Sequence, residues 1–289
     1  MKGRNSFYII TNHVKDPELE KTNLIKNYLE EKGKICYVQD SGGQEEDRRY
    51  KYTDASRIPA DVECVLVLGG DGTLLQASRD LVDTGIPLLG INMGTLGYLA
   101  EIEHQGIREA LDKLIAGDFT TEKRMMIAGS VYQNGKKLME DLALNDIVIG
   151  RRGRLRVVDF NIYVDDVFLC SYRADGIIIS TPTGSTGYSL SAGGPIVSPD
   201  ASLMLLTAIA PHTLNSRTIV LPDDVKISVE LGSSNLLDNE GAEVTFDGDT
   251  SMKLNVGSSI EVTKSEKSIR LIKINNTSFV QILRRKMNQ

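Results

Sequence analysis

Cysteine is scarce in this chain of 289 residues. Cys36, Cys64 and Cys170 are far apart, and each lies in an apolar segment. Three scattered thiols do not build a disulfide framework or a zinc site, so we expect a reducing compartment, by default the cytoplasm. No apolar run approaches the roughly 18 residues that cross a bilayer, and residues 1–30 lack the pattern of a signal peptide. The sequence therefore predicts no membrane partner.

Positive charge is also in short supply. The chain has 33 Lys and Arg against 39 Asp and Glu, a formal net charge of −6. A general nucleic-acid binder needs concentrated Lys and Arg to displace counterions, so we predict no nucleic-acid partner. The hydrophobic content of 41% is that of a globular protein, and the length allows two domains of ordinary size.

Several common catalytic motifs are missing. The sequence has no Gly-x-x-x-x-Gly-Lys-Ser/Thr, which excludes a P-loop phosphotransferase. It has no Gly-x-Gly-x-x-Gly after a strand with an acidic residue about twenty positions later, so a dehydrogenase loses its main support. No His and Cys set has zinc spacing, and no Ser/His/Asp arrangement is visible.

Residues 1–118 alternate between strand and helix patterns. Two β-α-β units joined by a long polar loop at 40–57 predict a parallel sheet with crossover helices, a Rossmann-like α/β amino-terminal domain. The apolar runs that predict strands are 7–10, 35–38, 64–68 and 87–91, and helical spacing covers 17–32, 73–84 and 106–116.

Residues 119–265 show a different pattern, in which short apolar or alternating segments are separated by turn residues. This pattern predicts a β-rich second domain, with hairpin turns at Asn134-Gly135 and Asp165-Asp166. We expect the last segment, 266–289, to pack back on the first domain. The predicted strands are 125–132, 138–149, 157–164, 176–180, 225–231, 243–247 and 259–263.

Gly69-Gly70-Asp71-Gly72-Thr73 lies between an apolar strand and a helix start. Such a turn points backbone N–H groups outward, where they and the helix dipole favour phosphate oxygens. A carboxylate would repel phosphate there unless it holds a metal ion or accepts a proton from an attacking hydroxyl. Asp71 is therefore the first candidate for chemistry; the alternative is that it only caps the helix. A second glycine loop, 92–97, should leave the same edge of the sheet.

Residues 181–191 interleave small hydroxyl side chains with Gly184 and Gly187. Such a surface can hydrogen-bond ribose hydroxyls and phosphates without filling their space, although a solvated loop has the same composition. With the first glycine turn, this segment indicates a kinase that acts on a nucleotide-sized substrate.

Asn145-Asp146 lies between apolar residues, and an amide beside an acid suits the two hydroxyls of a ribose. Neighbouring strand residues face opposite sides, so at most one faces a ligand unless the strand ends there. A simple strand-end turn remains an alternative. His212 could act on a phosphate or merely stack, Asp247-Gly248 most simply marks a turn, and the arginines between 151 and 156 could collect an anionic substrate or be solvated.

Five motifs, in order along residues 60–250, resemble those of bacterial NAD kinases. The glycine turn alone also occurs in diacylglycerol-type lipid kinases and phosphofructokinases, but the 181–191 segment is more restrictive. The motifs are Gly69-Gly70-Asp71-Gly72-Thr73; Gly90-Ile91-Asn92-x-Gly94-x-Leu96-Gly97-Tyr98-Leu99; Ala143-Leu144-Asn145-Asp146; Asp175-Gly176 to Tyr188-Ser189; and Pro211-His212-Thr213-Leu214.

The resemblance implies an α/β domain joined to a β-sandwich-like, NAD-binding domain, with the active site between them. Asp71 would accept the proton of the adenosine-ribose 2′-hydroxyl of NAD as that oxygen attacks the γ-phosphoryl group of ATP. Gly70 and Gly72 would lie against nucleotide phosphates, and Asn145 and Asp146 would bind ribose or the reacting diphosphate region. Mg²⁺ is implied because ATP is the donor.

The resemblance also implies contacts further along the chain. Asp175 would contact the nicotinamide side of NAD, while Arg173 and Arg156 would lie near substrate phosphates. The family generally forms homodimers or homotetramers, which we expect here. The residues implied in positioning NAD are Thr186, Gly187, Tyr188, Ser189, Leu190 and Ser191.

Three residues depart from the family pattern. Asp146 stands where Glu is usual, Gly187 where Ala is common, and Asp249 where Gln often follows Asp-Gly. They affect binding details more than the reaction. Two other functions remain: a lipid kinase of the diacylglycerol type, for which no amphipathic membrane-binding stretch is visible, and a non-catalytic nucleotide-binding regulator, which the charge of Asp71 disfavours.

Overall fold

The computed structural model describes residues 2–39, 53–94, 97–103, 106–153, 157–213, 216–232, 241–275 and 277–288. The chain forms two compact units, one of Met1–Lys123 with Ile269–Gln289 and one of Arg124–Ser268. Most of the loop expected at 40–57 lies outside the described residues. None of the helices within the described ranges is long and apolar enough to cross a membrane.

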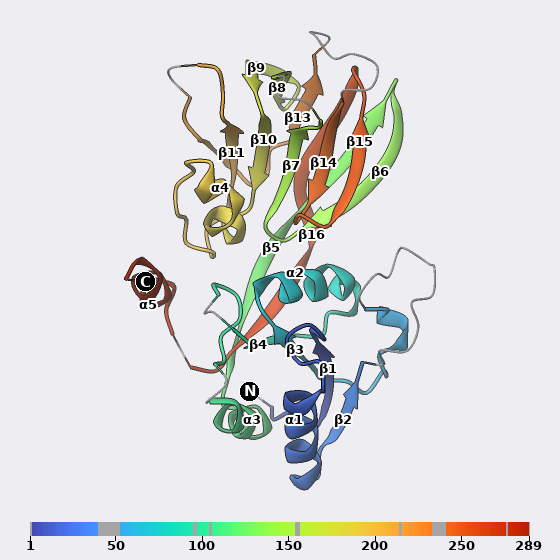
Figure 1. Ribbon diagram of the computed structural model, residues 1–289, viewed down its shortest axis with the longest axis vertical. Coiled ribbons are helices and arrows are strands. Elements are labelled where there is room, and N and C mark those ends of the chain that lie inside the picture. Colours follow the sequence, from blue (N-terminus) through green and yellow to red (C-terminus); the bar gives the residue numbers. More distant parts are fainter. Residues whose placement is uncertain are drawn as a thin grey trace. The chain divides into compact units, whose positions relative to one another are not determined.

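A parallel sheet forms the centre of the first unit, in the strand order β2–β1–β3–β4 (Figure 1). The central strands β3 and β4 are buried along their whole length, which explains their continuous apolar runs. The parallel sheet expected from the sequence is confirmed. The strands are β1 (Ser6–Thr11), β2 (Ile35–Val38), β3 (Cys64–Gly69) and β4 (Leu88–Asn92).

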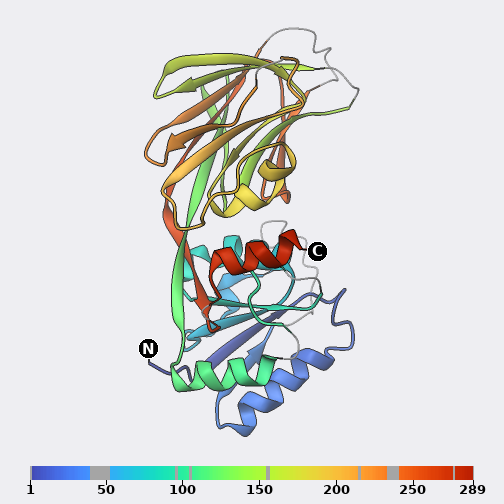
Figure 2. The same cartoon turned by 90° about the vertical axis from the view of Figure 1, so that its left-hand side faces the viewer.

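Helices cover both faces of this sheet. Figures 1 and 2 show α1 and α3 on one side and α2 on the other. Leu29 of α1 and Leu111 of α3 share a core with Leu66 of β3. The helix expected at 73–84 instead begins at Asp71 and gives way to a 3₁₀ turn, Val82–Thr84. The helices are α1 (Glu20–Glu31), α2 (Asp71–Asp80), α3 (Ile107–Ala116) and α5 (Phe279–Met287), with another 3₁₀ turn at Ala55–Arg57.

The second unit is a β-sandwich. One sheet contains β16–β13–β8–β9 together with β5 and β6, and the other follows the order β12–β11–β10–β7–β14–β15. Phe160 and Val229 from the first sheet share a core with Ile147 and Phe246 from the second. The strands are β5 (Thr120–Gln133), β6 (Lys136–Ala143), β7 (Asp146–Arg151), β8 (Val158–Val164), β9 (Val167–Ala174), β10 (Gly176–Ser180), β11 (Leu203–Ile209), β12 (Ile219–Pro222), β13 (Ile227–Leu231), β14 (Ala242–Phe246), β15 (Thr250–Leu254) and β16 (Ser258–Lys273).

Both hairpin turns expected from the sequence are present. Asn134 and Gly135 have φ of 51° and 74° between β5 and β6, and Asp165 and Asp166 have φ of 49° and 64° between β8 and β9. Positive φ at both central residues is the turn that matches strand twist. The segment expected as one strand at 138–149 is two strands, interrupted at residues 144 and 145. The strand expected at 259–263 is β16, which continues to Lys273.

Candidate functional site

Two loops leave the carboxyl edge of the parallel sheet side by side, as the sequence predicted. Gly69 at the end of β3 pairs with Asn92 at the end of β4. The N–H of Met93 donates to the carbonyl oxygen of Gly69 at 2.7 Å. Ligands of parallel sheets bind at this edge, so the glycine turn lies where a nucleotide is expected.

The carboxylate of Asp71 is held by consecutive backbone N–H groups from the second loop. Tyr98 donates to Oδ2 at 2.7 Å, and Leu99 and Ala100 each donate to Oδ1 at 3.2 Å. Gly97 has no room for a side chain, because a Cβ atom there would lie 1.9 Å from Oδ1. Asp71 therefore fixes the 98–100 backbone rather than capping its own helix. A carboxylate has about four lone-pair positions, and no other described donor bonds to it, so Oδ2 keeps one position.

Lys15 lies beside this glycine turn, a residue that the sequence analysis did not single out. Its Nζ atom is 3.0 Å from the position of a Cβ atom on Gly70 and 3.4 Å from one on Gly94. Lys15, Asn92 and Gly94 help to line an open cleft of about 1500 Å³. The available signal was a lysine a few residues past the end of the first strand, at the ligand-binding edge.

Asp247 organises a second group of residues, in the β-sandwich. It has a φ of 51°, and its carboxylate accepts N–H groups from Leu144 at 2.8 Å, Asn145 at 2.7 Å and Asp146 at 3.1 Å. These bonds hold residues 144 and 145 outside the strand pairing, so β6 ends before them and β7 begins after them. Asn145 therefore precedes the strand, which is the condition under which it and Asp146 can face one ligand.

Asn145 and Asp146 both lie against Gly187. A Cβ atom on Gly187 would be 3.5 Å from Nδ2 of Asn145 and 3.7 Å from Oδ2 of Asp146. Asp146 is 6% exposed, and burial, followed by the charge of Asp247, raises the pKa of its carboxyl group to about 7. Within the described ranges, no donor bonds to that carboxylate, and Oδ1 of Asn145 is buried without a partner. This pair can donate to and accept from a ligand hydroxyl.

The hydroxyl groups of residues 181–191 divide into two sets. The hydroxyls of Thr181, Ser185 and Ser189 are buried and bond within the fold, to the Leu144 carbonyl, the Pro182 carbonyl and the Thr207 hydroxyl respectively. These bonds turn the three hydroxyls inward, to the distant residues Leu144 and Thr207 for Thr181 and Ser189 and to the preceding turn for Ser185. Thr186 is half-buried, and the exposed residues are Tyr188, Leu190 and Ser191.

Asp175 and Arg173 do not join the Asn145–Asp146 pair. Asp146 is opposite Ser180, at the far end of β10 from Asp175, about 17 Å away at 3.3 Å per residue. Asp175 bonds to Nε of Arg151 at 2.7 Å, and Arg173 pairs with Asp159 at 3.2 Å. His212 is exposed, Asp249 is half-buried, and Arg156 lies outside the described residues.

A dedicated metal cage is not found in the described part of the chain, where no group of His, Cys, Asp and Glu side chains is arranged to hold an ion.

Comparisons with known proteins identify relatives over nearly the whole chain. The family model of the ATP-NAD kinase N-terminal domain matches residues 7–119, and that of the C-terminal domain matches residues 144–274. An NAD kinase of Lachnospira eligens is 43% identical over 290 residues, covering 97% of this chain and 99% of the relative. An NAD kinase of Lachnoclostridium phytofermentans is 44% identical, covering 97% of this chain and 98% of the relative.

Solved structures show the same fold. A yeast NADH kinase complexed with NADH matches with a TM-score of 0.84 at 23% identity, covering all of this chain and 88% of that one. An NAD kinase from Archaeoglobus fulgidus in complex with ATP matches with a TM-score of 0.73 at 25% identity, covering 98% of this chain and 97% of that one.

Proposed function

This chain belongs to the ATP-NAD kinase family and phosphorylates NAD to NADP with ATP, and from that premise we propose that Asp71 is the general base. The observation that carries the proposal is the held Asp71 carboxylate with one open position on Oδ2. That position would accept the proton of the 2′-hydroxyl of the adenosine ribose. The oxygen then bonds to the γ-phosphorus as the bond to ADP breaks.

Family membership decides against the two other functions that the sequence allowed. A lipid kinase could use the glycine turn alone, but the matches cover 7–119 and 144–274 and include the second unit. A non-catalytic regulator would bind phosphates better without Asp71, because the carboxylate adds repulsion at the turn.

The phosphates of ATP are proposed to lie over the glycine turn. Gly70 faces Lys15, whose ammonium group would offset phosphate charge, and a Cβ atom on Gly72 would meet no protein atom within 4 Å. Mg²⁺ usually binds through substrate phosphates and one or two carboxylates rather than a full protein cage, so this site fits a metal that arrives with ATP. The metal would be held through those phosphates and would offset their charge, which leaves the open position of Asp71 to the ribose hydroxyl.

The second unit is proposed to bind NAD. The support is that Asn145 and Asp146 both lie beside Gly187, with Oδ1 of Asn145 buried without a partner and Asp146 6% exposed. An amide and a carboxylate suit the hydroxyls of a ribose. The shorter Asp146 keeps a carboxylate at this place although the family usually has Glu. The accessible side chains that would position NAD are Thr186, Tyr188, Leu190 and Ser191.

The side chains of the remaining predicted contacts are held by partners within the protein. Ser189 could contribute only its backbone, because its hydroxyl is buried against Thr207. Asp175 and Arg173 are held by partners at the other end of β10, so their contacts with NAD remain predictions.

A homodimer or homotetramer is proposed as the assembly. Val167, Phe168 and Leu169 are exposed on β9, at the edge of its sheet, and an exposed apolar edge strand is a surface that another copy can cover. Light scattering after gel filtration tests this, because Phe168→Lys should lower the measured mass if this edge forms the interface. The cytoplasm is proposed as the location, supported by the three free cysteines, Cys36, Cys64 and Cys170.

The decisive experiment is NADP⁺ formation from purified protein, NAD⁺, ATP and Mg²⁺, read by an NADP-specific dehydrogenase. Asp71→Asn should lower kcat by about two to four orders of magnitude, the usual contribution of a general base. The matched control is Asp118→Asn, which changes an exposed acid of the same unit and should leave kcat unchanged. A folded Asp71→Asn protein with near-normal kcat would contradict the role of Asp71.

A further inference from the structure

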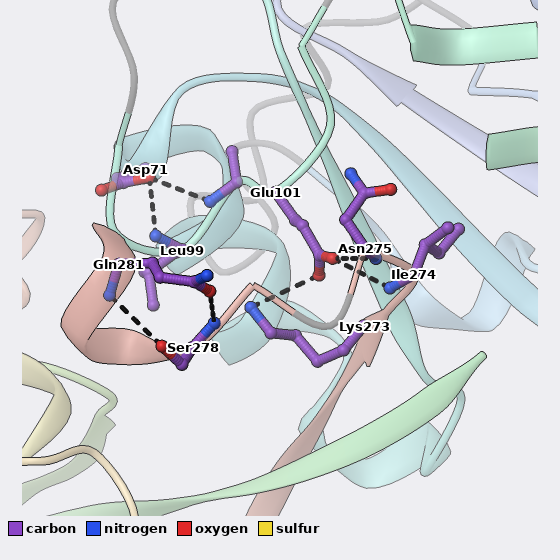
Figure 3. Close-up of polar contacts among 9 residues, drawn as sticks. Asp71, Leu99, Glu101, Lys273, Ile274, Asn275, Ser278 and Gln281 are labelled. Carbon is purple, nitrogen blue, oxygen red and sulfur yellow. Dashed lines mark hydrogen bonds and ion pairs between the residues drawn. The ribbon is translucent and has the colours of Figure 1, made fainter. Parts of the chain in front are cut away.

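Glu101 follows directly after the residues that hold Asp71, yet its own side chain faces the C-terminal segment. The side chain is 3% exposed, and its Oε2 lies 3.3 Å from Nζ of Lys273, which is 8% exposed. Oε1 accepts the N–H groups of Ile274 at 2.9 Å and Asn275 at 2.6 Å. Figure 3 shows both sets of bonds, Asp71 with Leu99 on one side and Glu101 with residues 273–275 on the other. A buried carboxylate is costly unless it is paired in this way.

The stretch of backbone that joins the two carboxylate sites is short. Residues 98–101 span only three peptide steps of 3.8 Å, so a displacement of Glu101 is passed to the N–H groups of Leu99 and Ala100. This run is also pressed against β4. The N–H of Glu101 donates to the carbonyl oxygen of Gly90 at 3.2 Å, and a Cβ atom on Gly90 would lie 2.8 Å from Cα of Ala100.

The C-terminal segment contacts the same run at further points. Helix α5 begins at a capping box formed by Ser278 and Gln281 (Figure 3). Along this helix, Lys286 places its ammonium group 5.4 Å from the centre of the Tyr98 ring. Tyr98 donates the shortest hydrogen bond to Asp71, so the segment after β16 supports both ends of the 98–101 run.

We propose that Glu101 is a positioning residue for Asp71. By fixing the backbone of Ile274 and Asn275 to the 98–101 run, it holds the N–H groups that aim the Asp71 carboxylate. The proposal rests on Asp71 as the base. The positioning depends on Oε1 of Glu101 as a hydrogen-bond acceptor, whereas the charge of Glu101 serves to pair Lys273.

Two double variants separate the acceptor from the charge. In Glu101→Gln/Lys273→Met the buried charges are removed together, and the amide oxygen can still accept the N–H groups of Ile274 and Asn275. Glu101→Ala/Lys273→Met has the same charge but lacks the acceptor. Glu109→Gln is the control, because Glu109 lies on α3 of the same unit, away from the cleft, and is 74% exposed.

The expected result is a split between kcat and KM. Glu101→Ala/Lys273→Met should lower kcat about 100-fold, the cost of a displacement of about 1 Å at a reacting group, with little change in either KM. Glu101→Gln/Lys273→Met and Glu109→Gln should both stay within about threefold of the parent kcat. In the Asp71→Asn background, the alanine double variant should cost little more, since the residue it positions is already disabled.

Three outcomes would overturn the proposal. Thermal unfolding of each variant first establishes that it is folded. If folded Glu101→Ala/Lys273→Met has parental kcat while Asp71→Asn is inactive, the proposed role of Glu101 is wrong and the role of Asp71 stands. An equal loss of kcat in the Asp71→Asn background shows that Glu101 acts independently of Asp71. Parental kcat in Asp71→Asn removes the proposed base, and the positioning role with it.

Discussion

Asp71 in the first unit and Asp247 in the second make the same set of bonds. Each accepts the N–H groups of three consecutive residues, with one on Oδ2 and two on Oδ1. The two sites differ in which polar atoms are left to bind a ligand. At Asp71 the carboxylate keeps an open position at the ligand edge, whereas at Asp247 the residues that it holds, Asn145 and Asp146, carry the polar atoms that face Gly187.

The same arrangement of a carboxylate and three backbone N–H groups therefore has two uses. At Asp71, backbone N–H groups fix a carboxylate that takes part in the reaction. At Asp247, a carboxylate fixes the backbone of residues whose side chains would bind the substrate. Substitutions at Asp71 should therefore change the rate, and substitutions at Asp247 should change stability and binding. Each of the following predictions tests one side of that contrast.

Among the variants that follow, Gly97→Ala should reduce kcat the most. The added methyl group would lie 1.9 Å from Oδ1 of Asp71, so the carboxylate must move away from its donors. We expect kcat to fall about 100-fold, as for a displacement of about 1 Å at a reacting group. Steady-state kinetics measure this, with Gly106→Ala as the control because no atom lies within 4 Å of a Cβ atom there. Normal kcat in Gly97→Ala would show that the aim of Asp71 is unimportant.

Gly72→Ala should raise stability and impair ATP binding together. A methyl group there meets no protein atom, and alanine in the helix is favoured by about 0.4–1 kcal/mol. The same methyl group would obstruct phosphates over the turn, so we expect the KM for ATP to rise about tenfold, or about 1.4 kcal/mol. Denaturation curves and ATP titrations measure the two effects.

Gly184→Ala provides the contrast in the second unit, since its methyl group would lie 2.1 Å from the Asn145 carbonyl oxygen and should destabilise the fold. If Gly72→Ala left the KM for ATP unchanged, phosphates would not lie over Gly72.

Asp247→Asn should act mainly on stability. The amide keeps one acceptor oxygen but loses the charge that holds residues 144–146, and the free energy of unfolding should fall by about 1–3 kcal/mol. Because Asn145 and Asp146 would be less well fixed, the KM for NAD should rise while kcat changes far less than in Asp71→Asn. Urea denaturation and kinetics measure both. A loss confined to kcat would erase the difference between the two carboxylates.

A further effect, confined to a window of pH, is a pH dependence of stability caused by Asp146. Its pKa is raised from 3.8 to about 7, so between these values the folded protein holds a proton that the unfolded chain has released. The free energy of unfolding should therefore fall as pH rises through this window, by up to about 1.4 kcal/mol per pH unit, and level off above it. Asp146→Asn should remove this contribution. Urea denaturation at several pH values compares the slopes, and identical slopes would exclude it.

Local signals in the sequence predicted much of the fold. The runs that became β3 and β4 are apolar throughout because both of their faces are buried, and the turn at Asn134-Gly135 tolerates positive φ by its residue types. Asp71 could be singled out because a carboxylate inside a glycine turn is chemically unusual.

What the sequence could not predict depends on distant partners. Asp247, about a hundred positions further along the chain, separates β6 from β7 by binding the residues between them. From the sequence, Asp247-Gly248 was interpreted only as a turn. The inward direction of the Ser189 hydroxyl depends on Thr207, and the approach of Lys15 to Gly70 depends on how β1 and β3 pair. Local composition contains none of these pairings.

The discontinuous first unit has a consequence for biosynthesis. The backbone that Glu101 binds lies 173 and 174 positions further along the chain, after the whole β-sandwich. A ribosome adds about 5–20 residues per second, so the N–H groups that hold Asp71 lack this support for about 9–35 seconds after residue 101 is made. The nascent chain can complete its β-sandwich first. The positioning of Asp71 by Glu101 is complete only after Ile274 and Asn275 have been synthesised.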